Sequence, residues 1–309
     1  MATSDQVAPG TPANRVLPKL TRLAVAAVFL GAFATSLSGL FVKLSELPPT
    51  ATGFYRLFLS APVLWLWLSW ERPRHAEFGA PRTWRDRFEL TLAASFYAIN
   101  TAVWCWCMRF TSVANGQLIV NVSPVCVTLV AFIFLRERMS GSFLAGLLLT
   151  LAGIALIMGQ SSALGGEHLY GDLLALVGAV FWSTYLIAIQ RLRRRFSTAT
   201  IMTWTAGVSS VMLLAGAVAA GERLIPETLY GWGPLLGLAF ISQVAGQGLI
   251  TFAIPQLAVS FTALALLIQP IYAALVAWAV LGEAPTLLQV MGGAVVLTGI
   301  ALARPRRRR

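Results

Sequence analysis

The chain has 309 residues, of which 57% are hydrophobic and only 11% are charged. Soluble domains carry about 25% charged residues, so this composition excludes an ordinary globular domain. The net charge of +11 is high enough to raise a nucleic-acid partner as an alternative, which the placement of the basic residues must decide.

Ten continuous apolar stretches follow a polar N-terminal segment. We expect residues 1–18 to form a disordered cytoplasmic tail, because they are polar and rich in proline. Each later stretch approaches the roughly 20 apolar residues that a helix needs to cross a bilayer. Lipid cannot satisfy the backbone of an open strand, so we predict an all-α integral membrane fold with ten transmembrane helices. The stretches are 21–42, 52–70, 89–108, 112–135, 141–159, 169–190, 199–219, 232–254, 258–281 and 285–303.

The positions of Lys and Arg indicate which loops face the cytoplasm. With a cytoplasmic N-terminus, 19 basic residues fall on the cytoplasmic side and three, namely Lys43, Arg109 and Arg223, fall on the other. We therefore expect both termini in the cytoplasm and the chain in a bacterial inner membrane. The basic cytoplasmic tail at 305–309 obeys the same rule, so the charge predicts orientation and no nucleic-acid partner.

A shift of 146 residues aligns the second half of the chain with the first. Four pairs of Pro, Glu and Gly coincide in this single register: Pro124 with Pro270, Glu137 with Glu283, Gly146 with Gly292, and Gly153 with Gly299. The repeats are expected at 20–160 and 168–304. Because each holds five crossings, an odd number, we expect two inverted five-helix repeats, the arrangement of many secondary transporters. Two halves of opposite orientation can exchange conformations, which predicts alternating access to a site between them.

A further pattern recurs in both halves. The prolines lie in stretches that end in Leu-x-Glu, at 135–137 and 281–283, and the next stretch closes on Gly-Ile-Ala-Leu. In these features the chain resembles two-copy EamA-domain members of the drug/metabolite transporter superfamily, and among them bacterial exporters of amino acids, including aromatic ones. The resemblance implies a central cavity lined mainly by helices one to four and six to nine, with the fifth and tenth packed outside.

Polar and aromatic side chains at membrane depth mark the expected cavity, because such groups are costly in lipid. Several lie three, four or seven residues apart and so share a helix face, and Gln243 is the repeat partner of Tyr97. Amides and hydroxyls can bind an α-amino and α-carboxyl pair, while aromatic faces pack an apolar side chain. Contact between helices is the alternative role. The predicted substrate-cavity residues are Tyr97, Asn100, Trp104, Trp182, Tyr185, Gln243, Gln247 and Gln269.

Proline, glycine and arginine add three further expectations. Pro124 and Pro270 each remove a helical hydrogen bond, which predicts kinks that shape the cavity or hinges for gating, with kinks favoured. The four repeat glycines indicate close helix packing or a dimer contact, so monomer and homodimer both stay open. Arg56 lies near the outer end of its stretch, where it could snorkel or recruit an anion; a structural role is favoured.

Energy coupling and chemistry are judged from what the apolar stretches hold. None has an Asp or Glu near its middle, which favours an uncoupled facilitator. Cys105, Cys107 and Cys126 lie within apolar stretches and are expected to be core residues, so we predict no metal site and no cofactor.

Transport of a small molecule is therefore favoured, specifically export of aromatic and other apolar amino acids. Efflux of drugs or another small metabolite is the alternative within transport. An integral-membrane enzyme would need a nucleophile with a base, a metal or paired carboxylates at depth. The two histidines, His75 and His168, are expected in loops, so no catalytic residue is predicted.

Overall fold

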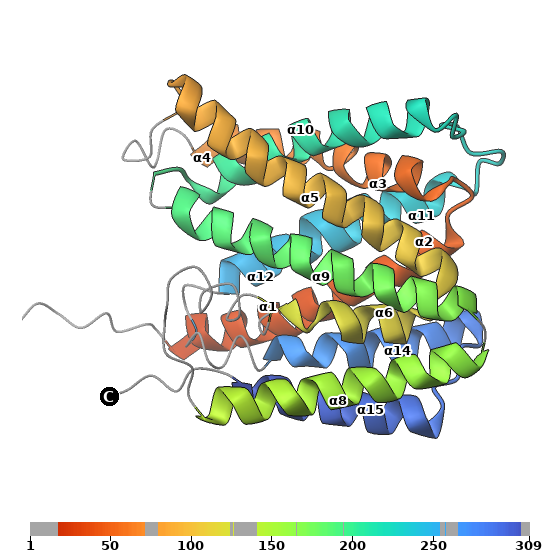
Figure 1. Cartoon of the computed structure of the whole chain (residues 1–309). Helices are drawn as coiled ribbons and strands as arrows, with labels where there is room; N and C mark the ends of the chain where they lie inside the picture. Colours follow the sequence, from red (N-terminus) through yellow and green to blue (C-terminus); the bar gives the residue numbers. More distant parts are fainter. Residues whose placement is uncertain are drawn as a thin grey trace, which may run out of the picture.

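The computed structural model describes residues 18–71, 80–123, 126, 141–164, 166–193, 195–253, 257 and 265–303. Every regular element in these ranges is helical, which confirms the all-α fold class (Figure 1). Five helical segments are long and apolar enough to cross a membrane, judged by length and composition: Arg22–Leu44, Trp84–Phe110, Gly166–Ile189, Thr198–Ala219 and Trp232–Ala253. Three shorter apolar helices accompany them, at Leu144–Met158, Leu266–Leu281 and Leu287–Leu302.

The helices follow the expected stretches in order. The first half holds α1 (Pro18–Ser36), α2 (Ser38–Leu44), α3 (Pro49–Phe58), α4 (Ala61–Glu71), α5 (Trp84–Phe110), α6 (Val113–Val120) and α8 (Gly141–Leu164). The second half holds α9 (Gly166–Leu192), α10 (Thr198–Ala219), α11 (Trp232–Leu236), the π-helix η1 (Gly237–Gly246), α12 (Gln247–Ala253), the 3-10 turn η3 (Leu266–Ile268), α14 (Gln269–Leu281) and α15 (Leu287–Ala303). Parts of the expected stretches 112–135 and 258–281 lie outside the described residues, as do Pro124, Glu137 and the basic tail.

Two of the expected spans are interrupted, and at each break a hydroxyl side chain bonds back to the helix; the second break also comes just before Pro62 in the first turn of α4. Thr35 Oγ1 donates to the carbonyl oxygens of Gly31 (2.9 Å) and Ala32 (3.0 Å), just before the break between α1 and α2. Ser60 Oγ donates to the Leu57 carbonyl (2.9 Å) in the break between α3 and α4. Such bonds compete with the helical ladder and bend helices.

Helix α5 of the first half and α9 of the second run antiparallel where they contact. On α5 and α9 the ring pairs are Phe110 with Tyr170, 5.1 Å apart, and Tyr97 with Tyr185, 4.7 Å apart. Residue numbers therefore fall along α5 as they rise along α9. Figure 1 shows these two helices side by side, and it shows α1 beginning on the side of the bundle where α15 ends.

The repeat glycines bring α8 against α15. A Cβ atom added to Gly153 would lie 2.8 Å from the Gly292 carbonyl oxygen, and one added to Gly299 would lie 2.7 Å from the Gly146 carbonyl oxygen. Real Cβ atoms do not approach so closely, so the pairing requires glycine at these positions. The expected close packing therefore occurs within the chain, and α8 and α15 form one edge of the bundle (Figure 1).

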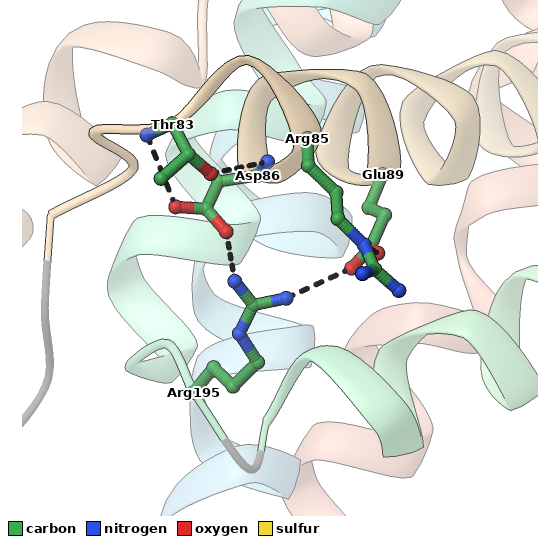
Figure 2. Close-up of polar contacts among 5 residues, drawn as sticks. All are labelled: Thr83, Arg85, Asp86, Glu89 and Arg195. Carbon is green, nitrogen blue, oxygen red and sulfur yellow. Dashed lines mark hydrogen bonds and ion pairs between the residues drawn. The ribbon is translucent and has the colours of Figure 1, made fainter.

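At the Trp84 end of α5 the two halves are joined by a group that we call the Arg195 cluster: Thr83, Asp86, Glu89 and Arg195 (Figure 2). Thr83 and Asp86 form a capping box, with the Asp86 amide 3.1 Å from Thr83 Oγ1 and the Thr83 amide 3.2 Å from Asp86 Oδ2. Arg195, from the connection between α9 and α10, forms ion pairs with Asp86 and with Glu89, the latter at 3.1 Å. The box fixes where α5 begins.

At the opposite end of the bundle, Glu283 joins the halves. Gly282 adopts a left-handed conformation (φ 72°) that ends α14 and turns the chain. The following Glu283 pairs with Lys43 of α2 and accepts a hydrogen bond from the backbone amide of Val113 (3.0 Å). One carboxylate thus holds α2, the start of α6 and the end of α14 together.

Candidate functional site

Tyr97 and Gln243 meet near the middle of the bundle. The Tyr97 hydroxyl donates to Gln243 Oε1 at 3.1 Å, across a sequence separation of 146 residues. Tyr97 is the midpoint of α5, and Gln243 lies within η1, between α11 and α12. Both side chains are buried. Residues at equivalent positions of the two repeats therefore touch at mid-depth.

Arg56 reaches the same point from α3. Its Nε donates to Gln243 Oε1 at 2.9 Å, and its Nη1 donates to Ser38 Oγ at 3.3 Å. The side chain is half-buried. The guanidinium thus contacts α2 of its own repeat and η1 of the other, and both acceptors are neutral.

Trp104 completes this polar centre, which we define as Ser38, Arg56, Tyr97, Trp104 and Gln243. Its indole Nε1 donates to Ser38 Oγ at 3.3 Å. Both Ser38 and Trp104 are buried. Each of the two acceptor oxygens in the centre, Ser38 Oγ and Gln243 Oε1, therefore receives two hydrogen bonds.

Three aromatic rings continue from the polar centre toward α9. Tyr97 lies 6.0 Å from Trp182 and 4.7 Å from Tyr185 between ring centroids, and Trp182 and Tyr185 are 5.5 Å apart. We call this group the aromatic trio. Rings at these separations attract each other and offer a face to an apolar group. Tyr97 belongs to both sets, so polar and aromatic surfaces are continuous.

A cavity of about 220 Å³ lies beside the polar centre, toward the end of the bundle that holds Lys43. Thr52, one helical turn before Arg56, and Cys105, the residue after Trp104, both line it. Its lining is Val42, Lys43, Ser45, Leu47, Pro49, Thr52, Cys105, Met108 and Arg109. The eight predicted cavity residues do not contribute to this lining, so the cavity adjoins the predicted site without coinciding with it.

A family model described as the EamA-like transporter family matches residues 22–159 and 169–304. The chain belongs to this family. The match confirms the expected resemblance, and together with the apolar helices it makes the chain a multi-pass membrane transport protein.

Several curated relatives are similar over most of the chain. An uncharacterized transporter of Archaeoglobus fulgidus is 23% identical, covering 86% of this chain and 91% of the relative. The pseudopaline exporter CntI of Pseudomonas aeruginosa is 24% identical, covering 93% and 98%. A "Probable terminal-alkyne amino-acid exporter" of Streptantibioticus cattleyicolor is 27% identical, covering 62% and 64%. These are names of transporters, not of enzymes. A crystal structure that is 18% identical aligns with a TM-score of 0.62, covering 92% of this chain and 96% of that one, which shows the fold alone.

Five of the eight predicted EamA cavity residues are contiguous in the structure: Tyr97, Trp104, Trp182, Tyr185 and Gln243. The other three have different neighbours or positions. Asn100 faces Gly178 of α9, Gln247 begins α12, and Gln269 Nε2 donates to Thr35 Oγ1 at 2.7 Å. Gln269 therefore connects α14 to α1 outside the polar centre.

The two prolines can be followed only in part. Pro270 occupies the first turn of α14, directly after the 3-10 turn η3, so the helix changes form at this residue. Pro124 lies outside the described residues. Their roles as kinks or gating hinges stay predictions.

Ser38 and Arg56 are members of the centre that sequence reasoning did not assign to a substrate site. Arg56 was visible as a charge within an apolar stretch, but the pattern does not reveal how far its side chain extends. Ser38 stood among other small polar residues. The π-helical segment around Gln243 also left no sequence signal, although such segments are frequent at functional sites.

The cysteines and other potential metal ligands stay dispersed in the described ranges. Cys105 and Cys107 are buried in the apolar core beside Met108 and Val113, as expected. In those ranges, no three side chains of His, Cys, Asp or Glu lie close enough together to hold a metal ion.

Proposed function

We propose that this EamA-family chain exports amino acids, chiefly aromatic and other apolar ones, across a bacterial inner membrane by alternating access. The observation that carries the proposal is the continuity of the polar centre with the aromatic trio at mid-depth. An amino acid has a charged α-amino and α-carboxyl pair, and an aromatic one also has a ring. The polar centre can bind the charged groups, and the aromatic trio can pack against the ring. The names of two relatives, a pseudopaline exporter and a terminal-alkyne amino-acid exporter, support export as the direction.

Alternating access requires two halves that can exchange conformations around the site. The antiparallel contacts between α5 and α9, and the reciprocal glycine contacts between α8 and α15, are those expected of inverted repeats at 20–160 and 168–304. Each end of the bundle has an ion-pair connection between the halves, Lys43 with Glu283 at one and Arg195 with Asp86 at the other. Opening toward one side of the membrane would break the connection at that side and keep the other.

Transport without coupling to a proton gradient is part of the proposal. The described carboxylates that join helices, such as Asp86, Asp172 and Glu283, lie close to helix ends. A proton carrier at the site would instead need a titratable group at mid-depth.

Efflux of a cationic drug is the competing function. The guanidinium of Arg56 lies in the polar centre with neutral partners, so it would repel a cation that occupied the same place. The electrostatics of the centre therefore favour a solute with a negatively charged group.

The test is counterflow of labelled L-phenylalanine into proteoliposomes that hold the purified protein, with and without a pH gradient. We expect saturable uptake that does not respond to the gradient and falls in Trp182→Ala. Leu23→Ala, a change at an exposed apolar position of α1, is the control and should transport normally. Uptake of a cationic dye in place of every amino acid tested would overturn the proposed substrate, and a strong response to the gradient would overturn uncoupled transport.

A further inference from the structure

Arg56 holds a positive charge among neutral partners near the middle of the bundle. Within the described ranges, ion pairs are formed by Lys43, Arg85, Arg195 and Arg223, and none involves Arg56. A charged side chain at membrane depth is costly unless an opposite charge or a water-filled space compensates it. Among the described residues no carboxylate lies within ion-pair distance of Arg56, which leaves the guanidinium able to pair with a negatively charged ligand.

The hydrogen bonds of the centre point to the same kind of ligand. Gln243 Oε1 and Ser38 Oγ each accept two bonds, from Arg56 together with Tyr97 or Trp104. Three donors find no acceptor among the described residues: Nη2 of Arg56, Nε2 of Gln243 and the hydroxyl of Ser38. The centre has more donors than acceptors, so the group that completes it must accept hydrogen bonds.

A carboxylate meets both requirements. Its two coplanar oxygens match two N–H groups of a guanidinium, and its single negative charge balances a single arginine. A phosphate dianion would leave excess negative charge at membrane depth. The aromatic trio, which begins at Tyr97 of the same centre, suits a ring attached to that carboxylate.

We propose that Arg56, Gln243 and Ser38 form the subsite for the α-carboxylate of the transported amino acid, an assignment that rests on the amino-acid transport proposed above. The apolar side chain then lies against Trp182 and Tyr185. Only molecules with a free carboxylate are good substrates; amides, esters and amines of the same shape are poor ones.

The second repeat has no arginine at the position equivalent to Arg56. The alignment of Thr50-Ala51-Thr52 with Thr198-Ala199-Thr200 places Trp204 opposite Arg56 in the second repeat. Trp204 Nε1 donates to Thr91 Oγ1 at 3.3 Å, so it is a neutral residue engaged elsewhere. One repeat supplies the cation, and the substrate is oriented with its carboxylate toward α3.

An alternative role for Arg56, stabilisation of the end of α3, must be excluded. It lies in the last turn of α3, where any cation interacts favourably with the helix dipole. Lysine would preserve that interaction but offers a point charge in place of a planar fork. Arg56→Lys and Arg56→Gln therefore separate a dipole role, which lysine fulfils, from carboxylate binding, which lysine fulfils only in part.

The experiment measures inhibition of labelled L-phenylalanine counterflow by two ligands, unlabelled L-phenylalanine and L-phenylalaninamide, in proteoliposomes. Wild type should prefer the carboxylate by about 10- to 100-fold, the range of a charge-assisted hydrogen bond. Arg56→Gln should lose that preference, and Arg56→Lys should keep part of it. Arg85→Gln, which removes an exposed arginine bonded to Glu89, should match wild type. Equal inhibition by both ligands in wild type, or an unchanged preference in Arg56→Gln, would refute the subsite.

A second readout separates this proposal from the proposed function. Thermal unfolding of the detergent-purified protein is followed with 3-phenylpropionate, which has the ring and the carboxylate but no amine. Stabilisation of wild type but not of Arg56→Gln supports the subsite even if no amino acid is transported, a result that would defeat only the proposed function. Absence of stabilisation in wild type would count against the subsite even where transport occurs.

Discussion

Arg195 and Arg56 both connect the first repeat to the second, and they differ in what they contact. Arg195 pairs with two carboxylates, Asp86 and Glu89, and Asp86 is held in turn by the Thr83 capping box (Figure 2). Arg56 contacts an amide oxygen and a hydroxyl. An arginine whose counter-charge belongs to the protein stabilises the fold, whereas an arginine without one is available to a ligand.

Gln243→Glu converts the Arg56 environment into one like that of Arg195, and we expect the largest effect from it. The new carboxylate would pair with Arg56 and occupy the donors that the substrate needs. Counterflow of L-phenylalanine should fall by at least about tenfold, the least that loss of a charge-assisted hydrogen bond produces. Thermal unfolding should show a protein as stable as wild type or more so.

Gln289→Glu is the matched control for that variant, because it adds the same charge where Gln289 caps α15, away from the polar centre. It should transport normally. If Gln243→Glu also transported normally, the carboxylate would have to bind elsewhere.

Removal of the ring at Trp182 should have the next largest effect. Trp182→Ala deletes one member of the aromatic trio and leaves Arg56 in place. We expect weaker competition by L-phenylalanine, by a factor of several, and little change for L-alanine, since a single ring pair contributes about 0.5–1.5 kcal/mol beyond its buried area. Inhibition constants for the two amino acids measure this, and an equal loss for both would mean that Trp182 supports the fold instead of the side chain.

Arg195→Gln should affect stability and leave selectivity intact. Its side chain is half-exposed, and exposed ion pairs contribute about 0–1 kcal/mol, so the thermal midpoint should fall by a few degrees at most. The preference for L-phenylalanine over its amide should equal that of wild type. A loss of that preference would remove the distinction between the two arginines.

The smallest expected effect is on thermal stability and comes from replacing Glu46, which lies at the end of the bundle that holds Lys43. Hydrogen bonds from the Thr228 hydroxyl, first, and then from its backbone amide lower the pKa of the Glu46 carboxyl below its usual 4.5. Because the folded-state pKa is the lower one, this stabilisation is complete above the unfolded-state pKa and is lost as the pH falls through the folded value.

Glu46→Gln should therefore lower the thermal midpoint slightly at neutral pH, and the difference from wild type should shrink below pH 4.5. Unfolding scans from acidic to neutral pH measure it. A difference that grew on acidification would contradict the contacts described for Glu46.

Much of the fold could be predicted from composition and repeats. The order of the helices, the start of α8 and the end of α10 follow from where the apolar residues lie. The four repeat glycines indicated close packing or a dimer contact, and the structure shows that their partner is the other helix of the pair, α8 or α15. The break near Thr35 could not be predicted, because it depends on how that hydroxyl bonds back to the helix. The break near Ser60 comes just before Pro62, which cannot donate to the helical ladder, so the sequence does hold a signal for it.

Part of the candidate site could be predicted from the internal repeat. Tyr97 and Gln243 occupy equivalent positions, and such positions can meet on an axis between the halves. For Arg56, anion recruitment was one of two alternatives, and a structural role was favoured. Its contact with η1 was not predictable, because the long side chain reaches Gln243 from a position near the end of its span. Gln269 illustrates the converse: a polar residue at membrane depth that bonds Thr35 of a neighbouring helix.

The most direct test of the role of Arg56 is an experimental structure of the protein with L-phenylalanine bound. We expect the carboxylate about 2.7–2.9 Å from the Arg56 guanidinium, within reach of Ser38 and Gln243, with the ring against Trp182 and Tyr185. A carboxylate bound instead at Lys43 or Arg109 in the adjoining cavity, with Arg56 still bonded only to Gln243 and Ser38, would contradict that role.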